Sequence, residues 1–198
     1  MEERKSGWNA GDATAENFRP RLALYHASAR GTGCAVKIEL HPAHGQKDGC
    51  FMLTAASQSA VGDRTGAAPK FARFDWENSI TVKLDFADLC QFLQVFRGES
   101  ESIGDGKGLF HTSQAATTKI CLRHIVDPLP GYVLDLFRTP RGRAETRAHF
   151  MFSPGEAQGL CCAIEGSMCY VCFGIPMVIP RNVPASGTVR KEADDAAA

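Results

Sequence analysis

Residues 80–98 read ITVKLDFADLCQFLQVFRG, and their hydrophobic period changes from two to about 3.6 part-way along. In ITVKL the apolar side chains alternate with Thr and Lys, which predicts a half-buried strand. Asp85 is a residue type that caps helix N-termini, and Gly98 can adopt the left-handed conformation that ends a helix. Between them the apolar residues recur at helical spacing: Leu89, Phe92, Leu93 and Phe96. The stretch therefore predicts a strand followed directly by an amphipathic helix.

The same switch recurs at residues 147–166, RAHFMFSPGEAQGLCCAIEG. An alternating stretch leads into SPGE (153–156), which has the pattern of a capping box with Pro at the first helical position. Asp85 and Ser153 are 68 residues apart, and so are Gly98 and Gly166. The two segments align from cap to cap, which indicates an internal repeat.

A second pair of segments supports the repeat. LALYHASARG (22–31) and GLFHTSQAAT (108–117) share an aromatic residue, a His and a Ser in the same order, 85 residues apart. The aligned pairs are Tyr25 and Phe110, His26 and His111, and Ser28 and Ser113. The difference between 85 and 68 predicts 17 extra residues in the first copy. The Gly- and Ala-rich segment 57–75 is the candidate insertion, because the second copy has only the turn 138–146 there.

Each copy contains two further strand candidates bounded by Gly or Pro turns. They lie at 33–42 and 49–57 in the first copy and at 117–126 and 131–140 in the second. The chain is therefore predicted to be β-β-β-β-α twice. The predicted fold class is α+β, with two antiparallel four-stranded sheets, two amphipathic helices, and one packed and one open face on each sheet.

We expect a single domain over residues 21–179, made of the repeats 21–98 and 108–166 with an apolar extension to 179. Residues 1–20 and 180–198 lack periodicity and are predicted to be disordered tails. The apolar run 161–179 fits either the core or a subunit interface. No apolar run reaches the ~20 residues that span a bilayer, so no membrane partner is expected and the expected location is the cytoplasm. The eight cysteines lie within apolar runs, which predicts reduced, buried thiols.

The duplicated β-β-β-β-α arrangement resembles the Whirly fold of plant Whirly proteins and trypanosome mitochondrial RNA-binding proteins, with the single-repeat positive-cofactor coactivators as relatives. The resemblance spans 21–179 as topology. One local similarity is GDGKGLFH (104–111), which places Lys107 between glycines before a strand, as in the Lys-Gly-Lys stretch of the plant proteins. The resemblance implies binding of single-stranded DNA or RNA across sheet surfaces and assembly as a homo-oligomer, a dimer or a tetramer.

Single strands are held by cations that follow the phosphates and by aromatic rings on which bases stack. The long loop and strand of the first copy alternate the two types at Lys70, Phe71, Arg73, Phe74 and Trp76. In the other interpretation these rings fold the loop back onto the sheet, and Tyr25 and Phe110 form a structural pair rather than base platforms. The remaining candidate cations lie on predicted polar strand faces or near turns: Lys37, Lys83, Lys107, Lys119, Arg123, Arg138, Arg141 and Arg143.

Catalytic and metal-binding patterns are weak in this sequence. Cys161-Cys162 and Cys169-x-x-Cys172 have poor spacing for zinc, and the CxxC follows a predicted helix rather than opening one, unlike a thioredoxin motif. His26 and His111 occupy equivalent repeat positions, which favours a structural role. The Gly-rich stretch at 104–108 lacks the phosphate-loop pattern. We expect no catalytic residues, no metal and no cofactor.

The sequence therefore predicts a non-catalytic single-stranded nucleic-acid-binding protein, with DNA favoured over RNA. The formal net charge of zero supplies no global field for polyanions. This motivates one alternative, a protein-interaction scaffold that kept the fold without the ligand. A thiol or zinc protein is a further alternative.

Overall fold

The computed structural model describes residues 21–174 except 45, 64 and 66–69. The predicted tails 1–20 and 180–198 lie outside the described residues, as does the end of the apolar extension, 175–179. None of the helices in the described part is both long enough and apolar enough to cross a membrane.

The first repeat forms an antiparallel sheet followed by a helix. Its strands are β1 (Arg21–His26), β2 (Cys34–His41), β3 (Cys50–Ala60), β4 (Arg73–Phe74) and β5 (Ile80–Leu84), and α1 (Phe86–Phe96) follows. The order is β1-β2-β3, and both β4 and β5 pair with β3. The sheet has five strands rather than the predicted four, because the insertion contributes the two-residue strand β4.

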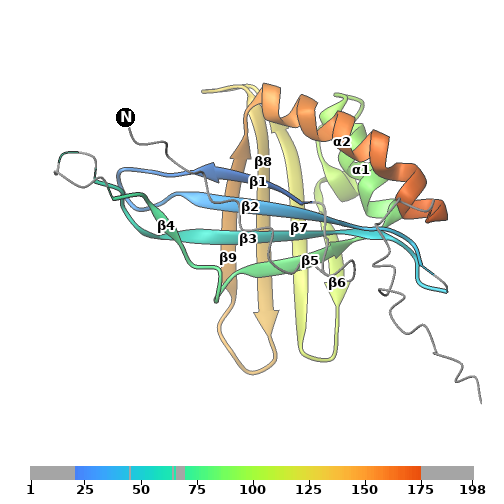
Figure 1. Ribbon diagram of the computed structural model, residues 1–198, viewed down its shortest axis with the longest axis horizontal. Coiled ribbons are helices and arrows are strands. Elements are labelled where there is room, and N and C mark those ends of the chain that lie inside the picture. Colours follow the sequence, from blue (N-terminus) through green and yellow to red (C-terminus); the bar gives the residue numbers. More distant parts are fainter. Residues whose placement is uncertain (1–20, 45, 64, 66–69, 175–198) are drawn as a thin grey trace, which may run out of the picture. The chain divides into compact units, whose positions relative to one another are not determined.

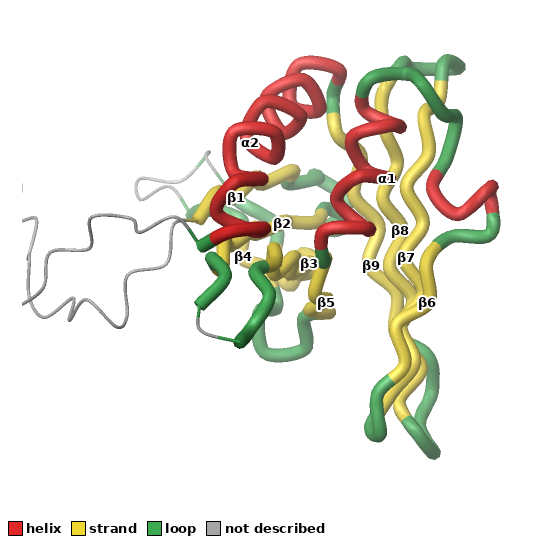
Figure 2. Tube along the Cα trace, turned by 90° about the vertical axis from the view of Figure 1, so that its right-hand side faces the viewer, coloured by secondary structure: helices red, strands yellow, loops and turns green. Residues whose placement is uncertain are grey.

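The second repeat begins with a 3-10 turn, η2 (Ile103–Gly106). Its sheet contains β6 (Leu109–Thr112), β7 (Ala116–Ile125), β8 (Gly131–Pro140) and β9 (Thr146–Phe152), paired in chain order, and α2 (Pro154–Phe173) follows. The strands of the two sheets run across one another, and both helices lie at the same end of the second sheet (Figure 1). The two α-helices lie beside each other (Figure 2), and Arg97 joins them through a 2.8 Å ion pair with Glu165. The structure thus confirms the duplicated α+β architecture.

Both helices begin where the sequence predicts. Asp85 and Ser153 each accept a hydrogen bond from the backbone N–H three residues later, and both capping boxes are complete. The predicted end of the second helix at Gly166 is wrong, since α2 continues to Phe173 and is capped by Gly174 at φ 55°. Val171 is buried in the core, and this burial outweighs the cost of about 1 kcal/mol for a glycine inside a helix.

The core lies between the packed faces of the two sheets and the two helices. The fully buried side chains include Leu53 of β3, Leu89 of α1, and Phe150 and Phe152 of β9. The apolar stripe predicted for α1 is buried here, as are Leu160, Cys161 and Ile164 of α2, and the opposite face of each sheet is left open.

The two repeats are joined by a reciprocal pair of contacts. His26 Nε2 of the first repeat lies 2.7 Å from Glu156 Oε1 at the start of α2. His111 Nε2 of the second repeat lies 3.1 Å from Asp88 Oδ2 at the start of α1. Each His therefore contacts the third helical residue of the other copy, which supports the structural interpretation of both histidines.

Candidate nucleic-acid interface

The open face of the second sheet carries a row of alternating rings and cations. Strand register places Phe110, Lys119, Phe137 and Arg147 side by side, one from each of β6 to β9. The Lys119 Nζ lies 5.5 Å from the Phe110 ring centroid, and the Arg147 guanidinium lies 5.0 Å from that of Phe137. We call this surface, with the neighbouring Arg123, the second face. It combines the two components that single-strand binding requires, stacking rings and phosphate-binding cations.

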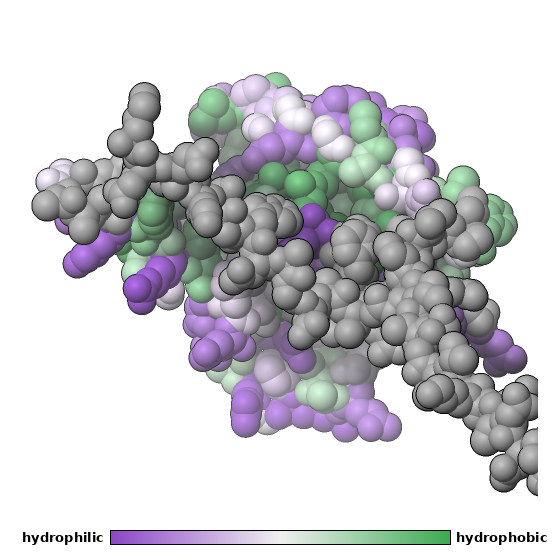
Figure 3. All heavy atoms as spheres, in the orientation of Figure 1, coloured by the Kyte–Doolittle hydropathy of each residue, from purple (hydrophilic) through white to green (hydrophobic). Residues whose placement is uncertain are grey.

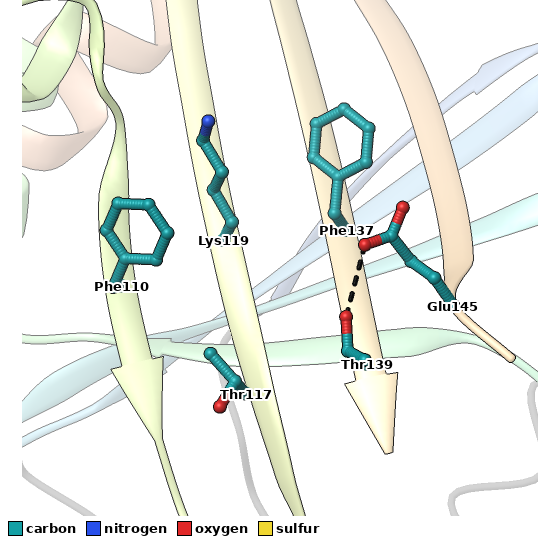
Figure 4. Close-up of a pocket in the computed structure, with 6 residues that line it drawn as sticks. All are labelled: Phe110, Thr117, Lys119, Phe137, Thr139 and Glu145. Atoms are coloured by element: carbon teal, nitrogen blue, oxygen red, sulfur yellow. Dashed lines mark hydrogen bonds between the residues drawn. The ribbon is translucent and has the colours of Figure 1, made fainter. Parts of the chain in front are cut away.

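A shallow hollow of about 300 Å³ lies over this row. Figure 4 shows the Phe110, Lys119 and Phe137 side chains arranged across it, with Thr117 and Thr139 below them. The Thr139 hydroxyl donates a 3.1 Å hydrogen bond to Glu145 (Figure 4). The Phe110 side chain is 60% exposed, so its ring is available to a stacking base.

Asp135 fixes the cations of the second face. This carboxylate is buried on β8, and its Oδ1 accepts a 2.8 Å hydrogen bond from Arg147 and lies 2.8 Å from His149 Nδ1. Arg123 Nη2 lies 4.0 Å from the other carboxylate oxygen, Asp135 Oδ2. Burial acts to raise the pKa of Asp135, but the hydrogen bonds from Arg147 and His149 outweigh it and hold the pKa below its usual value. Asp135 is therefore an ionised anchor beneath the row.

The open face of the first sheet carries an aromatic cluster of different origin. The Tyr25 ring of β1 lies 5.6 Å from that of Phe74, near the end of the insertion, and 6.4 Å from that of Trp76, just after it. Beneath them, Ala35 and Ala56 are fully buried although they point to the open face. The insertion thus folds back onto the sheet, as the structural interpretation expects, but onto its open side.

A groove of about 370 Å³ lies beside this cluster, and we call the cluster and groove together the first face. Trp76 lines the groove, and the Lys37 Nζ lies 5.9 Å from its ring centroid. The Thr54 and Thr81 side chains also line it, with their hydroxyls 3.0 Å apart. The other lining residues are Glu39, His41, Met52 and Ser79.

The structure brings together only some of the predicted binding residues. Lys37, Phe74, Trp76 and Lys83 share the first face, and Lys119 and Arg123 share the second. Register also places on the second face Phe137, which the sequence did not single out, and Arg147 of the basic β8–β9 hairpin. The two aromatic residues weighed as base platforms, Tyr25 and Phe110, lie on the first and second faces. Tyr25 and Phe110 are 59% and 60% exposed, so both rings are accessible from solvent on their faces.

The other predicted cations lie away from the first and second faces. Lys70 and Arg73 are exposed on the insertion, and Lys107 is exposed at the end of η2. Arg138 lies opposite the inward-facing Thr118. Arg141 and Arg143 are exposed in the β8–β9 turn, at an end of the sheet that is hydrophilic in Figure 3. These residues do not form one continuous track with the rows.

Solved structures of the plant Whirly group share this arrangement. WHY1 from Arabidopsis thaliana superposes with a TM-score of 0.63 at 14% identity, covering 79% of this chain and 87% of that protein. WHY3 from the same plant gives 0.61 at 15% identity, with 78% and 89% covered. The chain has the Whirly fold. A third structure with the Whirly fold, the plant transcriptional regulator PBF-2, gives 0.60 at 14% identity, with 78% and 82% covered. No protein-family model and no curated protein matches the sequence itself.

The prediction that all the cysteines are buried is wrong for several of them. Cys34, Cys50 and Cys161 are buried, whereas Cys162, Cys169 and Cys172 are exposed. Cys169 and Cys172 are exposed because α2 extends to Phe173 and places them on its solvent side. Burial raises the pKa of Cys34 to about 11. Within the described ranges, no three His, Cys, Asp or Glu side chains are grouped so that they could hold a metal ion.

Proposed function

We propose that this protein binds single-stranded nucleic acid without catalysis, through the open faces of its two sheets. The observation that carries the proposal is the row of the second face, in which ring, cation, ring and cation come from four successive strands. Bases unstacked from a duplex can lie on the Phe110 and Phe137 rings while Lys119 and Arg147 contact phosphates. A duplex offers no such exposed base faces, so the row favours single strands.

We further propose DNA over RNA and a homo-oligomeric state. One of the structures sharing the Whirly fold is named as a transcriptional regulator, and transcription is regulated at DNA. The exposed thiol-bearing side of α2, which ends in the 79% exposed Phe173, is an apolar surface that a second copy would cover.

Fluorescence anisotropy with labelled single-stranded and double-stranded DNA and RNA, at two salt concentrations, tests the proposal. We expect the tightest binding to single-stranded DNA, and an affinity that falls as salt rises because bound phosphates release counterions. Equal affinity for duplex and single strand would contradict the stacking model.

One observation favours the scaffold alternative. Lys37 and Arg147 are each paired with a carboxylate, Glu39 at 3.2 Å and Asp135 at 2.8 Å, so part of the positive charge on the faces is neutralised. If no oligonucleotide binds at low salt and a protein partner co-purifies in stoichiometric amount, the scaffold function replaces nucleic-acid binding.

A further inference from the structure

A carboxylate occupies the groove of the first face, where a nucleic-acid surface would be expected to carry only cations and neutral groups. The Glu39 side chain is only 16% exposed and lies among Lys37, Thr54 and Trp76. A partly buried carboxylate repels phosphate, so a ligand that occupies this groove is expected to present hydrogen-bond donors to Glu39. Base edges, which carry N–H donors, are the alternative.

Glu39 has fewer polar contacts than Asp135, the buried carboxylate of the second face. Asp135 receives one hydrogen bond from Arg147 and faces His149, both at 2.8 Å. Among the described residues, the polar contact of Glu39 is with Lys37, whose Nζ lies 3.2 Å from Oε2. A carboxylate has about four lone-pair sites, so Glu39 can accept further donors from a ligand.

The Lys37–Glu39 pair presents a donor next to an acceptor. The Watson–Crick edge of guanine presents the complementary order, the O6 acceptor followed by the N1–H and N2–H donors. We infer that the groove of the first face is a guanine-reading site, in which Glu39 accepts from N1–H and N2–H, Lys37 donates to O6, and Trp76 stacks on the base. The inference rests on the proposed function, since the guanine belongs to a bound single strand.

The other bases fit the pair less well. Thymine and uracil have one N–H between two carbonyl oxygens, and these oxygens would face the Glu39 carboxylate. Adenine and cytosine each offer a single amino group beside a ring nitrogen that accepts. Guanine alone supplies two adjacent donors to one carboxylate, which is the bidentate geometry that gives strong base discrimination.

Cations flank the reading pair and can hold the neighbouring phosphates. Strand register places Arg21, Glu39, Met52 and Lys83 in one row across β1, β2, β3 and β5. The positive side chains lie at the two ends of this row and the carboxylate lies inside it. This arrangement separates phosphate binding from base reading within one face.

Paired oligonucleotides that differ at a single base test the inference. A labelled 12-nucleotide oligo-dT is compared by anisotropy with the same strand carrying one central guanine, and with one carrying inosine, which lacks the N2 amine. We expect the guanine strand to bind roughly 5-fold or more tightly than oligo-dT, the lower end of a bidentate contact. Inosine should lose much of this advantage.

The Glu39→Gln variant removes the carboxylate, and we expect its guanine and oligo-dT affinities to become nearly equal. Glu145→Gln, which removes one negative charge from the second face, is the matched control and should keep the guanine preference. Tight binding of all three strands by the unmodified protein without a guanine preference would overturn the inference and leave the proposed function standing. A guanine preference that survives in Glu39→Gln would overturn the role of Glu39. No binding to any strand would overturn the proposed function, and the inference with it.

Discussion

Replacing Phe110 with Ala tests the second face most directly. The Phe110 ring is 60% exposed at the first position of the row, and Lys119 lies 5.5 Å from its centroid. A base stacked on an aromatic side chain contributes about 1–3 kcal/mol to binding. Because 1.4 kcal/mol corresponds to a factor of ten, the variant should bind single strands roughly 5- to 150-fold more weakly.

The same substitution should change folding stability much less. Full burial of a Phe side chain contributes about 1.5–3 kcal/mol, and less than half of this one is buried, so the cost is about 1 kcal/mol. Anisotropy with a labelled oligo-dT measures the affinity, and urea unfolding measures the stability. Phe110→Trp keeps a ring for stacking and should retain the affinity.

Phe86→Ala is the matched control, since this Phe is 50% exposed at the start of α1 and lies on neither open face. We expect its oligo-dT affinity to match that of the unmodified protein. If Phe110→Ala binds as tightly as the unmodified protein while remaining folded, or if both Ala variants lose affinity equally, the row is not the binding surface and the reasoning fails.

Four other outcomes are expected. If Lys119, Arg123 and Arg147 of the second face contact phosphates, a plot of log affinity against log salt concentration, measured by anisotropy, should have a slope of about −2. Asp135→Asn should lower the free energy of unfolding, measured with urea, above pH 4, and its difference from the unmodified protein should shrink in acid. The reason is that a carboxyl whose folded-state pKa is lowered stabilises the fold above its ordinary pKa of 3.8, and this stabilisation is lost as the pH falls through the folded-state pKa. At pH 8, a thiol reagent should label Cys162 readily and Cys34 only after unfolding, since Cys34 is buried and its pKa is raised to about 11. Gly108→Ala should destabilise the protein by roughly 1–3 kcal/mol in urea unfolding, because φ is +79° and a Cβ would lie 2.5 Å from the Ile120 carbonyl oxygen.

The repeat and the helix starts were predictable because their signals are local. Capping boxes and hydrophobic periods are read within a few residues, and Asp85 and Ser153 cap as expected. The insertion was also placed correctly. Ala55 and Leu136, 81 positions apart, pair with Ile80 and Ala148, which are 68 apart, so 13 of the 17 extra residues lie between β3 and β5.

The row of the second face was not predictable because it depends on register between strands. Phe137 and Arg147 become neighbours of Phe110 and Lys119 only through the pairing of four strands, which turn lengths determine. The end of α2 was missed for a similar reason. Gly166 is a local stop signal, but the contact of Val171 with the core is a tertiary effect that the sequence period does not report.

The two open faces carry different residues at equivalent positions of the repeat. The positions equivalent to Phe110, Lys119, Phe137 and Arg147 are Tyr25, Ala35, Ala56 and Ser79, so the first sheet lacks both cations and one ring of the row. The small alanines leave room for Phe74 and Trp76, at the end of the insertion and just after it.

Trp76 therefore lines the groove of the first face from a residue outside the strands, whereas the rings of the second face come from the strands themselves. A surface built from strand side chains alone can follow any sequence by stacking. A groove lined by both Glu39 and Lys37 can discriminate between bases, because a base that enters it must satisfy fixed donors and acceptors. Under the proposed function, the insertion is thus the element that would make one of the two open faces selective.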